Sequence, residues 1–220
     1  MGRCVVMNKD DDILSLNKTA WNNLAEKYEK HHPIWLDEPN VLFDLFCSHL
    51  SEKSLVLDIG SGTGLPYAKL LIERGFSVLG IDIAPQMLKV AQRNVPQAEF
   101  KELSMIELNF ENMFDGAVSS FSMLLLSPLQ FKDVASRIAR ALKKGGIFYL
   151  SLNEPWGENP DEHTIIEILG EKMYSRGYFI EEVIDIFTPL GMKLLKMHKE
   201  LQTSEIFGEE HTVSYVFRLK

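Results

Sequence analysis

The sequence predicts an α/β fold, and three neighbouring features around residue 60 support this prediction. Residues 55–59 are apolar except for Asp58 and show no alternation, which is typical of a strand buried on both faces. A turn with glycine at every second position follows at residues 60–64. Pro66 then begins a segment with a helical apolar stripe, since proline is well tolerated in a first helical turn. A strand, a glycine turn and a helix form the first half of a nucleotide-binding βαβ unit.

The spacing of the glycines separates two classes of cofactor. A dinucleotide-binding turn has the pattern G-x-G-x-x-G, whereas Leu65 stands here at the place of the third glycine and Gly64 comes one residue earlier. Asp58 also brings a carboxylate to the region where a pyrophosphate would approach the helix N-terminus. An anion at this place is unfavourable for a pyrophosphate. It suits a ligand that carries an ammonium group and a sulfonium.

The segment Asp58-Ile-Gly60-Ser-Gly62-Thr-Gly64 resembles the first motif of the class I S-adenosylmethionine-dependent methyltransferases. This resemblance implies a Rossmann-like sheet of seven mostly parallel strands, with helices on both faces and an antiparallel last strand. It also implies S-adenosylmethionine as the cofactor. The next predicted strand, residues 76–81, agrees with it, because the strand ends in Asp82 about twenty residues beyond the turn. An acid at that place is positioned to accept both ribose hydroxyls.

The expected cofactor-binding residues lie on the glycine turn, after the neighbouring strands and on an N-terminal helix. Ile83 and Met87 flank the ribose acid and are expected to sandwich the adenine ring, although methionine at helical spacing is more often a core residue. Ser104 stands where the family commonly has an acid that contacts the adenine amino group, and a hydroxyl accepts that hydrogen bond more weakly. The expected set is Asp58, Gly60, Ser61, Gly62, Gly64, Asp82, Ile83, Met87, Ser104, Met105, Ser120 and Tyr28.

The acceptor side of the site carries no recognisable motif. The residues expected to form its wall follow strand ends that open toward the ligand: Phe121, Ser122, Trp156, Tyr174 and Arg176. A sulfonium methyl group is already electrophilic, so members of the family often have no fixed catalytic residue. The candidates for a general base near neutral pH are His31, His32 and His163. The acceptor and the kind of atom methylated (O, N or C) are left open by the sequence.

The N-terminal part is expected to form a helical cap over the sheet. Residues 1–12 are polar, acidic at positions 10–12 and without periodicity, and we expect residues 1–16 to form a disordered tail. From residue 17, one helical face carries Trp21, Leu24, Ala25 and Tyr28. This pattern is similar to the helix that precedes the domain in many small-molecule methyltransferases and folds over the cofactor, which implies a lid. The alternative is that Trp21 and Tyr28 are only core anchors, and this is the interpretation that we favour for Trp21. A second helix at residues 39–50 completes the cap.

Residues 51–220 are expected to form the Rossmann-like core of a single methyltransferase domain that spans residues 17–220. Beyond the first two strands, further strands are predicted at residues 97–103, 114–120, 147–152, 192–201 and 212–219. Helices are predicted after Pro85 and at residues 134–142, 164–172 and 180–189. Residues 153–178 are expected to form an insertion of loop and helix on the ligand side.

Composition narrows the class of protein further. The chain has 220 residues with 45% hydrophobic and 25% charged content, which fits one globular domain. It has no apolar run near the ~20 residues of a membrane span, and its first residues contain no signal-peptide core. Cys4 and Cys47 show no metal-binding spacing, so we expect reduced thiols, no metal site and a cytoplasmic protein.

The charge of the chain bears on its partners. The net charge is −8 and basic residues do not cluster, which disfavours a nucleic-acid substrate because binding to phosphates depends on Lys and Arg. We therefore expect a small-molecule acceptor, no membrane partner, and a monomer or homodimer. Two other classes remain open. One is a protein that binds S-adenosylmethionine without catalysis, and the other is a nicotinamide-dependent oxidoreductase, which the glycine spacing and Asp58 disfavour.

Overall fold

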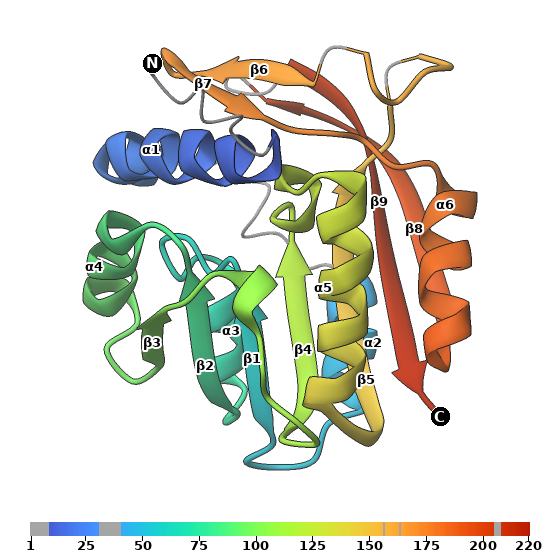
Figure 1. Ribbon diagram of the computed structural model, residues 1–220. Helices are drawn as coiled ribbons and strands as arrows, with labels where there is room; N and C mark the ends of the chain where they lie inside the picture. The colour runs from blue at the N-terminus through green and yellow to red at the C-terminus, as the bar shows by residue number, and fades with distance from the viewer. Residues whose placement is uncertain (1–8, 31–40, 156, 163, 205–207) are drawn as a thin grey trace, which may run out of the picture.

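A seven-stranded sheet forms the centre of the protein (Figure 1). The computed structural model describes residues 9–30, 41–155, 157–162, 164–204 and 208–220. The strand order is β3-β2-β1-β4-β5-β9-β8; β1 to β5 run parallel, and β9 is antiparallel to both of its neighbours. The predicted mostly parallel sheet with an antiparallel last strand is confirmed. The strands are β1 (Leu55–Ile59), β2 (Ser77–Asp82), β3 (Glu99–Glu102), β4 (Phe114–Ser120), β5 (Leu142–Asn153), β8 (Met192–Ser204) and β9 (Gly208–Leu219).

Helices cover both faces of the sheet, as predicted (Figure 1). On one face, α2 (Val41–Ser48) and α3 (Tyr67–Glu73) share an apolar cluster with Val56 of β1. On the other face, α5 (Pro128–Ala141) and α6 (Ile180–Phe187) share a cluster with Leu57 and Ile59. These three β1 residues are fully buried, which explains why the strand shows no alternation in sequence. The remaining helical segments are α1 (Lys9–Lys30), α4 (Pro85–Asn94) and the single turns η2 (Met105–Glu107), η3 (Met123–Leu125) and η4 (Thr188–Leu190).

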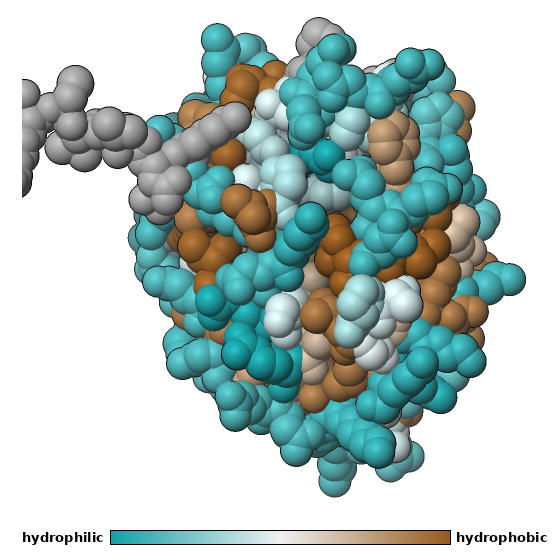
Figure 2. All heavy atoms as spheres, turned by 45° about the vertical axis from the view of Figure 1, so that its right-hand side comes forward, coloured by the Kyte–Doolittle hydropathy of each residue, from teal (hydrophilic) through white to brown (hydrophobic). Residues whose placement is uncertain are grey.

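On the face shown in Figure 2, hydrophilic side chains alternate with several apolar areas. The large apolar side chains with the greatest exposure lie on different elements or loops: Val41, Met113, Leu129, Ile165 and Leu201. No helix in the described ranges combines the length and hydropathy of a membrane span.

The helix predicted at residues 164–172 is wrong. The segment forms a hairpin of β6 (Ile165–Ile168) and β7 (Glu171–Tyr174). Its two-residue turn, Leu169 and Gly170, has φ of 48° and 89°, and paired positive φ values match the twist of a tight hairpin. The apolar spacing of this short segment fits a helix as well as a strand, whereas its run of β-branched isoleucines favours the strand.

The expected disordered tail is also shorter than predicted. Helix α1 begins at Lys9, so residues 9–16 are helical and only residues 1–8 lie outside the described part of the chain. Ile13 is 7% exposed, which shows that this turn of the helix packs against the domain. Asp10 and Asp12 belong to the acidic run that was interpreted as a sign of disorder. They stand at the start of a helix, where negative charge is favourable to the helix dipole.

Helix α1 lies across the carboxyl ends of the parallel strands and is held there by apolar packing (Figure 1). Ala20, Leu24 and Ala25 are at most 1% exposed and pack in one cluster with Met87 of α4 and Met173 of β7. The predicted apolar face of this helix is therefore confirmed. It joins α4 on one side of the domain to the β6–β7 hairpin on the other.

A buried asparagine side chain connects α1 to the hairpin. The amide nitrogen of Asn17 donates to the carbonyl oxygens of Leu125 (2.9 Å) and Tyr174 (3.2 Å), and its oxygen accepts from the backbone N–H of Tyr174 (2.8 Å). Asn17 is 4% exposed, so these backbone groups have little access to water. The side-chain amide of Asn17 thus pairs with backbone groups as a neighbouring strand would, and it connects segments that are distant in sequence.

We expect Asn17→Ala to lower the free energy of unfolding by about 1–3 kcal/mol, because it leaves buried backbone groups of Tyr174 and Leu125 without partners. Urea unfolding followed by circular dichroism measures the change. Asn23→Ala is the matched control: the side chain of Asn23 lies on the same helix and makes an exposed hydrogen bond to Glu171. The control should stay within about 0.5 kcal/mol of the wild type. Equal effects of the two substitutions would contradict the anchoring role of Asn17.

Candidate active site

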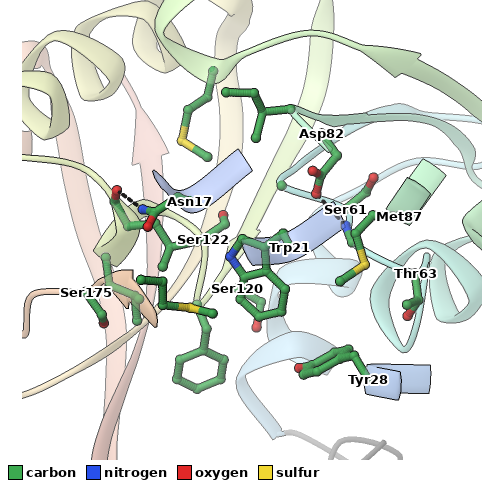
Figure 3. Close-up of a pocket in the computed structure, with 18 of the residues that line it drawn as sticks. Asn17, Trp21, Tyr28, Ser61, Thr63, Asp82, Met87, Ser120, Ser122 and Ser175 are labelled. Carbon is green, nitrogen blue, oxygen red and sulfur yellow. Dashed lines mark hydrogen bonds between the residues drawn. The ribbon is translucent and has the colours of Figure 1, made fainter. Parts of the chain in front are cut away.

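A cavity opens at the carboxyl edge of the sheet, where the strand order reverses between β1 and β4. Its cofactor side is formed by the glycine turn after β1 and by the loops after β2 and β3. Its acceptor side is formed by the loop after β4, the ends of β5 and β9, and the β6–β7 hairpin. Helix α1 contributes residues to both sides, and Figure 3 shows Trp21 between Asp82 and Met87 on one side and Asn17 and Ser175 on the other. We call this space the ligand cavity.

The ligand cavity brings together most of the residues expected to bind the cofactor. Those that line it are Asp58, Gly60, Ser61, Gly62, Asp82, Ile83, Met87, Ser104, Met105, Ser120 and Tyr28. They come from five separate segments of the chain, which meet only because parallel strands end at one edge of the sheet. Their individual contacts with a cofactor remain predictions.

The glycines of the turn have different structural roles. Gly62 has φ of 52°, and a Cβ atom added to it would meet no protein atom within 4 Å, so the backbone there faces open space. Gly64, with φ of 77°, does not line the cavity, and the expectation that it touches the cofactor is not supported. A Cβ atom on Gly64 would lie 3.2 Å from Val95 and 3.3 Å from Phe100. Gly64 therefore permits close packing of the turn against the C-terminal end of α4 and against β3.

Asp82 fastens the glycine turn to the end of β2. Its Oδ2 accepts from the backbone N–H of Gly62 (2.9 Å), and its Oδ1 accepts from the N–H of Ala84 (2.8 Å). Burial raises the pKa of Asp82, while the backbone N–H groups of Ala84 and Gly62 act in the opposite direction. A carboxylate has about four acceptor sites, so both oxygens retain capacity for further donors from a ligand.

Asp58 presents a buried carboxylate to the same side of the cavity. The residue is 4% exposed, and within the described part of the chain no hydrogen bond is made to its side-chain oxygens. Burial and the neighbouring charge of Asp82 raise the pKa of Asp58 to about 7. Two acids that oppose each other's ionisation favour a cationic ligand between or beside them, because a positive charge offsets both burial and repulsion.

The loop after β4 is locked onto β1 and directs a phenylalanine toward the cavity. The hydroxyl of Ser122 donates to the carbonyl oxygen of Ile59 (2.6 Å) and is 2.8 Å from the hydroxyl of Ser119. Phe121 has φ of 51°, a conformation that costs energy for a bulky residue and is common at functional sites. Phe121 and Ser122 both line the cavity, as expected for the acceptor wall.

Two other residues expected in the acceptor wall do not reach the cavity. Arg176 is 4% exposed and is bound by Asp161 (2.7 Å) and Glu182 (3.0 Å), so it joins the insertion to α6. Tyr174 is buried, and its backbone pairs with Asn17. Because the segment is a strand and not a helix, successive side chains point to opposite sides. The residues that line the cavity are accordingly Met173 and Ser175.

The remaining predicted positions lie outside the described residues. They are Trp156 of the expected acceptor wall and the three candidate bases His31, His32 and His163. Within the described ranges, no group of three or more His, Cys, Asp or Glu side chains is arranged to hold a metal ion.

Sequence reasoning missed several residues that line the cavity. Trp21 was expected to be a core anchor, yet it lines the cavity. Its indole N–H is buried and has no hydrogen-bond partner among the residues that the structure describes. Its ring packs edge-to-face with Tyr28 at a centroid distance of 5.3 Å. The seven-residue spacing between these two aromatic residues on one helical face was the available signal. Asn153 and Glu210 also line the cavity, and no sequence pattern marks either of them.

Comparisons with known proteins agree with this geometry. A family model described as a methyltransferase domain matches residues 56–146. An uncharacterized methyltransferase of Synechocystis is 36% identical over 100 residues, which are 45% of this chain and 46% of that protein. Another, from Alkaliphilus oremlandii, is 25% identical over 209 residues, which are 87% of this chain and 89% of that protein. A ubiquinone biosynthesis O-methyltransferase of Idiomarina loihiensis is 35% identical over 104 residues, 44% of this chain and 42% of that protein.

Solved structures show the same fold. A 1,6-didemethyltoxoflavin-N1-methyltransferase of Burkholderia thailandensis, with bound substrate and S-adenosylhomocysteine, superposes with a TM-score of 0.72 at 19% identity and covers 97% of this chain and 92% of its own. A methyltransferase of Methanosarcina mazei gives a TM-score of 0.71 at 18% identity, over 83% of this chain and 98% of its own. This chain spans about half the length of the Synechocystis and Idiomarina relatives.

The fold, the glycine turn with its two acids and these matches together indicate the class of protein: residues 56–146 match a methyltransferase domain, and the chain has the fold of the S-adenosylmethionine-dependent methyltransferases. These comparisons support S-adenosylmethionine as the cofactor. The lining of the ligand cavity is compatible with this molecule. Among the described residues, the carboxylate of Asp58 has no hydrogen-bond donor, Asp82 retains acceptor capacity, and Gly62 leaves space beside the backbone.

We expect Asp82→Ala to weaken S-adenosylmethionine binding by about 2–4 kcal/mol, because two charge-assisted hydrogen bonds to the ribose, each worth about 1.5–3 kcal/mol, would be lost. Isothermal titration calorimetry measures the dissociation constant. Asp133→Ala is the control, since Asp133 is an exposed acid on α5 that pairs with Arg137. An unchanged dissociation constant in folded Asp82→Ala protein would exclude the ribose assignment.

We also expect helix α1 to act as a lid. Amide hydrogen exchange in residues 9–30 should slow when S-adenosylhomocysteine is added, because Trp21 and Tyr28 would gain a ligand surface to pack against. Exchange in β8, which is distant from the cavity, should change little and serves as the internal control. Equal protection of α1 with and without ligand would show that the helix is a static wall of the cavity.

Proposed function

We propose that this protein transfers the methyl group of S-adenosylmethionine to a small-molecule acceptor. The observation that supports this most directly is the enclosure of the acceptor side. Helix α1 and the β6–β7 hairpin extend over the carboxyl edge of the sheet, and both contribute residues to the cavity (Figure 1). A space bounded in this way suits a compact molecule better than a polymer. The net charge of −8 also opposes a nucleic-acid substrate.

The residues of the cofactor side divide into three roles in this proposal. Asp58 binds the cationic part of the cofactor, and Asp82 binds the ribose hydroxyls. Ile83 and Met87 pack against the adenine ring, whose edge meets the loop that carries Ser104. With these roles, we expect the reactive end of the cofactor near the end of β4, beside Ser120 and the acceptor side.

The protein then has two tasks, which are orientation and exclusion of water. S-adenosylmethionine supplies an electrophilic methyl group on a sulfonium, so the chain need not generate reactivity. Alignment of an acceptor with that methyl group can supply effective molarities on the order of 10⁵–10⁸ M. The apolar side chains on the acceptor side, among them Phe121, Ile168 and Met173, favour an acceptor with a largely apolar body. We place this reaction in the cytoplasm and expect a monomer or homodimer.

An acceptor screen tests the proposal. We expect micromolar binding of S-adenosylmethionine and S-adenosylhomocysteine by calorimetry, and production of S-adenosylhomocysteine with at least one apolar compound that carries a nucleophilic O, N or C atom. Gly62→Val should abolish both readouts while preserving the circular dichroism spectrum, because its side chain would occupy the open space beside the turn. Cofactor binding without turnover across a broad screen would favour a non-catalytic binding protein. Saturable binding to RNA or DNA at physiological salt would contradict the choice of acceptor.

A further inference from the structure

The roles proposed above do not include one carboxylate on the acceptor side of the cavity. Glu210, at the start of β9, lines the ligand cavity beside Asn153 at the end of β5. The amide nitrogen of Asn153 donates to Oε1 of Glu210 at 2.7 Å. Within the described part of the chain, no hydrogen bond is made to Oε2 of Glu210, and the amide oxygen of Asn153 is buried without a partner. Two acceptor atoms thus lie at the cavity without a donor.

The sheet places this pair next to the proposed reaction centre. The backbone N–H of Phe121 donates to the carbonyl oxygen of Ser151 at 3.0 Å, which brings the loop after β4 against β5. Asn153 follows two residues later on β5, so its side chain leaves the sheet on the same face as that of Ser151. In the register of β5 and β9, Asn153 pairs with Thr212, and Glu210 precedes Thr212 by two residues. Glu210 therefore extends the row of cavity residues at the strand ends.

We propose that Glu210 binds the N–H or O–H group of the methyl acceptor and takes its proton during methyl transfer. This inference rests on the proposed function and deepens it by naming the acceptor class: a compact molecule with an apolar body and one nucleophilic N–H or O–H group. The apolar body would pack against Leu125, Ile166 and Met173, which line the same side of the cavity.

The step balances in atoms and charge. The lone pair of the acceptor atom forms a bond to the methyl carbon, and the bond from that carbon to sulfur breaks with its electron pair remaining on sulfur. The acceptor's proton passes to Oε2 of Glu210, which becomes a neutral carboxylic acid. Asn153 is a positioning residue in this scheme, because its amide holds Oε1 and leaves Oε2 toward the acceptor. The proton returns to solvent when the methylated product leaves.

The charges around Glu210 are compatible with this role. Burial raises the pKa of Glu210 to about 7, and the hydrogen bond from Asn153 acts in the opposite direction. Tyr28 faces Glu210 from α1. Burial and the negative charge of Glu210 raise the pKa of Tyr28 to about 12, so this phenol stays protonated. From β8, Lys199 is paired with Glu154 at the end of β5, and the strand residue opposite Glu210 is the uncharged Gln202. On β9 itself, Glu209 and His211 are exposed. A carboxyl group that titrates near neutral pH is suited to general base catalysis.

The test uses four aromatic probes of one size: 4-methylphenol, 4-methylaniline, 4-methylbenzylamine and the non-donor 4-methylanisole. Calorimetry measures their binding to protein loaded with S-adenosylhomocysteine, and product formation is followed with S-adenosylmethionine. We expect a donor probe to bind at least tenfold more tightly than 4-methylanisole. Glu210→Gln should remove that preference and lower kcat by about 10²-fold or more, while S-adenosylhomocysteine affinity stays within twofold of the wild type. Glu209→Gln, the exposed neighbour, is the matched control and should behave as the wild type.

The pH profile separates proton transfer from a purely structural role. In the wild type, kcat/KM should rise with pH through about 7, because Glu210 acts only after it loses its proton. Asn153→Ala removes a hydrogen bond that favours the ionised carboxylate, so it should move the midpoint to higher pH. Wild-type turnover and profile in Glu210→Gln, or no preference for any donor probe, would overturn the inference. Failure of the wild type to bind S-adenosylhomocysteine would contradict the proposed function itself. The comparison of the probes tests only the role of Glu210, so the two failures can be told apart.

Discussion

The hydrogen bond from the backbone N–H of Gly62 to the carboxylate of Asp82 connects the two loops on which the cofactor side depends. Through it, the turn after β1 and the end of β2 form one rigid unit, with Asp58 beside them. This arrangement buries two neighbouring acids, and burial together with the charge of Asp82 raises the pKa of Asp58 to about 7. The folded protein therefore binds a proton more tightly than the unfolded chain at this position, and the stability contributed by Asp58 falls as pH rises from about 4 toward 7. A bound cation offsets this repulsion. Without a ligand, the repulsion lowers the stability of the folded protein.

The acceptor side depends on contacts between segments that are remote in sequence. Asn17 on α1 satisfies the backbone of Tyr174 on β7, and α1 then presents Trp21 and Tyr28 to the cavity. The cavity is thus enclosed only because segments from the beginning and the end of the domain pack together. The parallel sheet holds the cofactor side of the cavity, whereas helix α1 and the hairpin shape the acceptor side. A fold divided in this way can serve different acceptors when only the added elements change.

Hydroxyl groups inside the sheet support the strands beneath the acceptor side. The hydroxyl of Ser151 on β5 lies 2.8 Å from that of Ser214 on β9, and the phenol of Tyr149 is 3.2 Å from the same serine. The phenol of Tyr67, whose side chain lines the cavity, is 3.2 Å from that of Tyr149. Because these buried groups satisfy one another, they hold β5 and β9 in a fixed register. That register determines where Asn153 and Glu210 emerge at the edge of the sheet.

The sequence by itself determined the parallel core, the glycine turn and the acids Asp58 and Asp82, because a buried strand, a tight turn and a helix leave local patterns in residue type and spacing. It also indicated which face of α1 is apolar. Only the tertiary structure showed that residues 164–172 form a hairpin, that Gly64 faces α4, and that Glu210 belongs to the cavity. A short apolar segment fits two periodicities, and a polar residue on a strand carries no mark of which distant side chain will meet it. The cofactor side was readable because its residues are local in sequence, whereas the acceptor side is assembled by long-range contacts that no local pattern encodes.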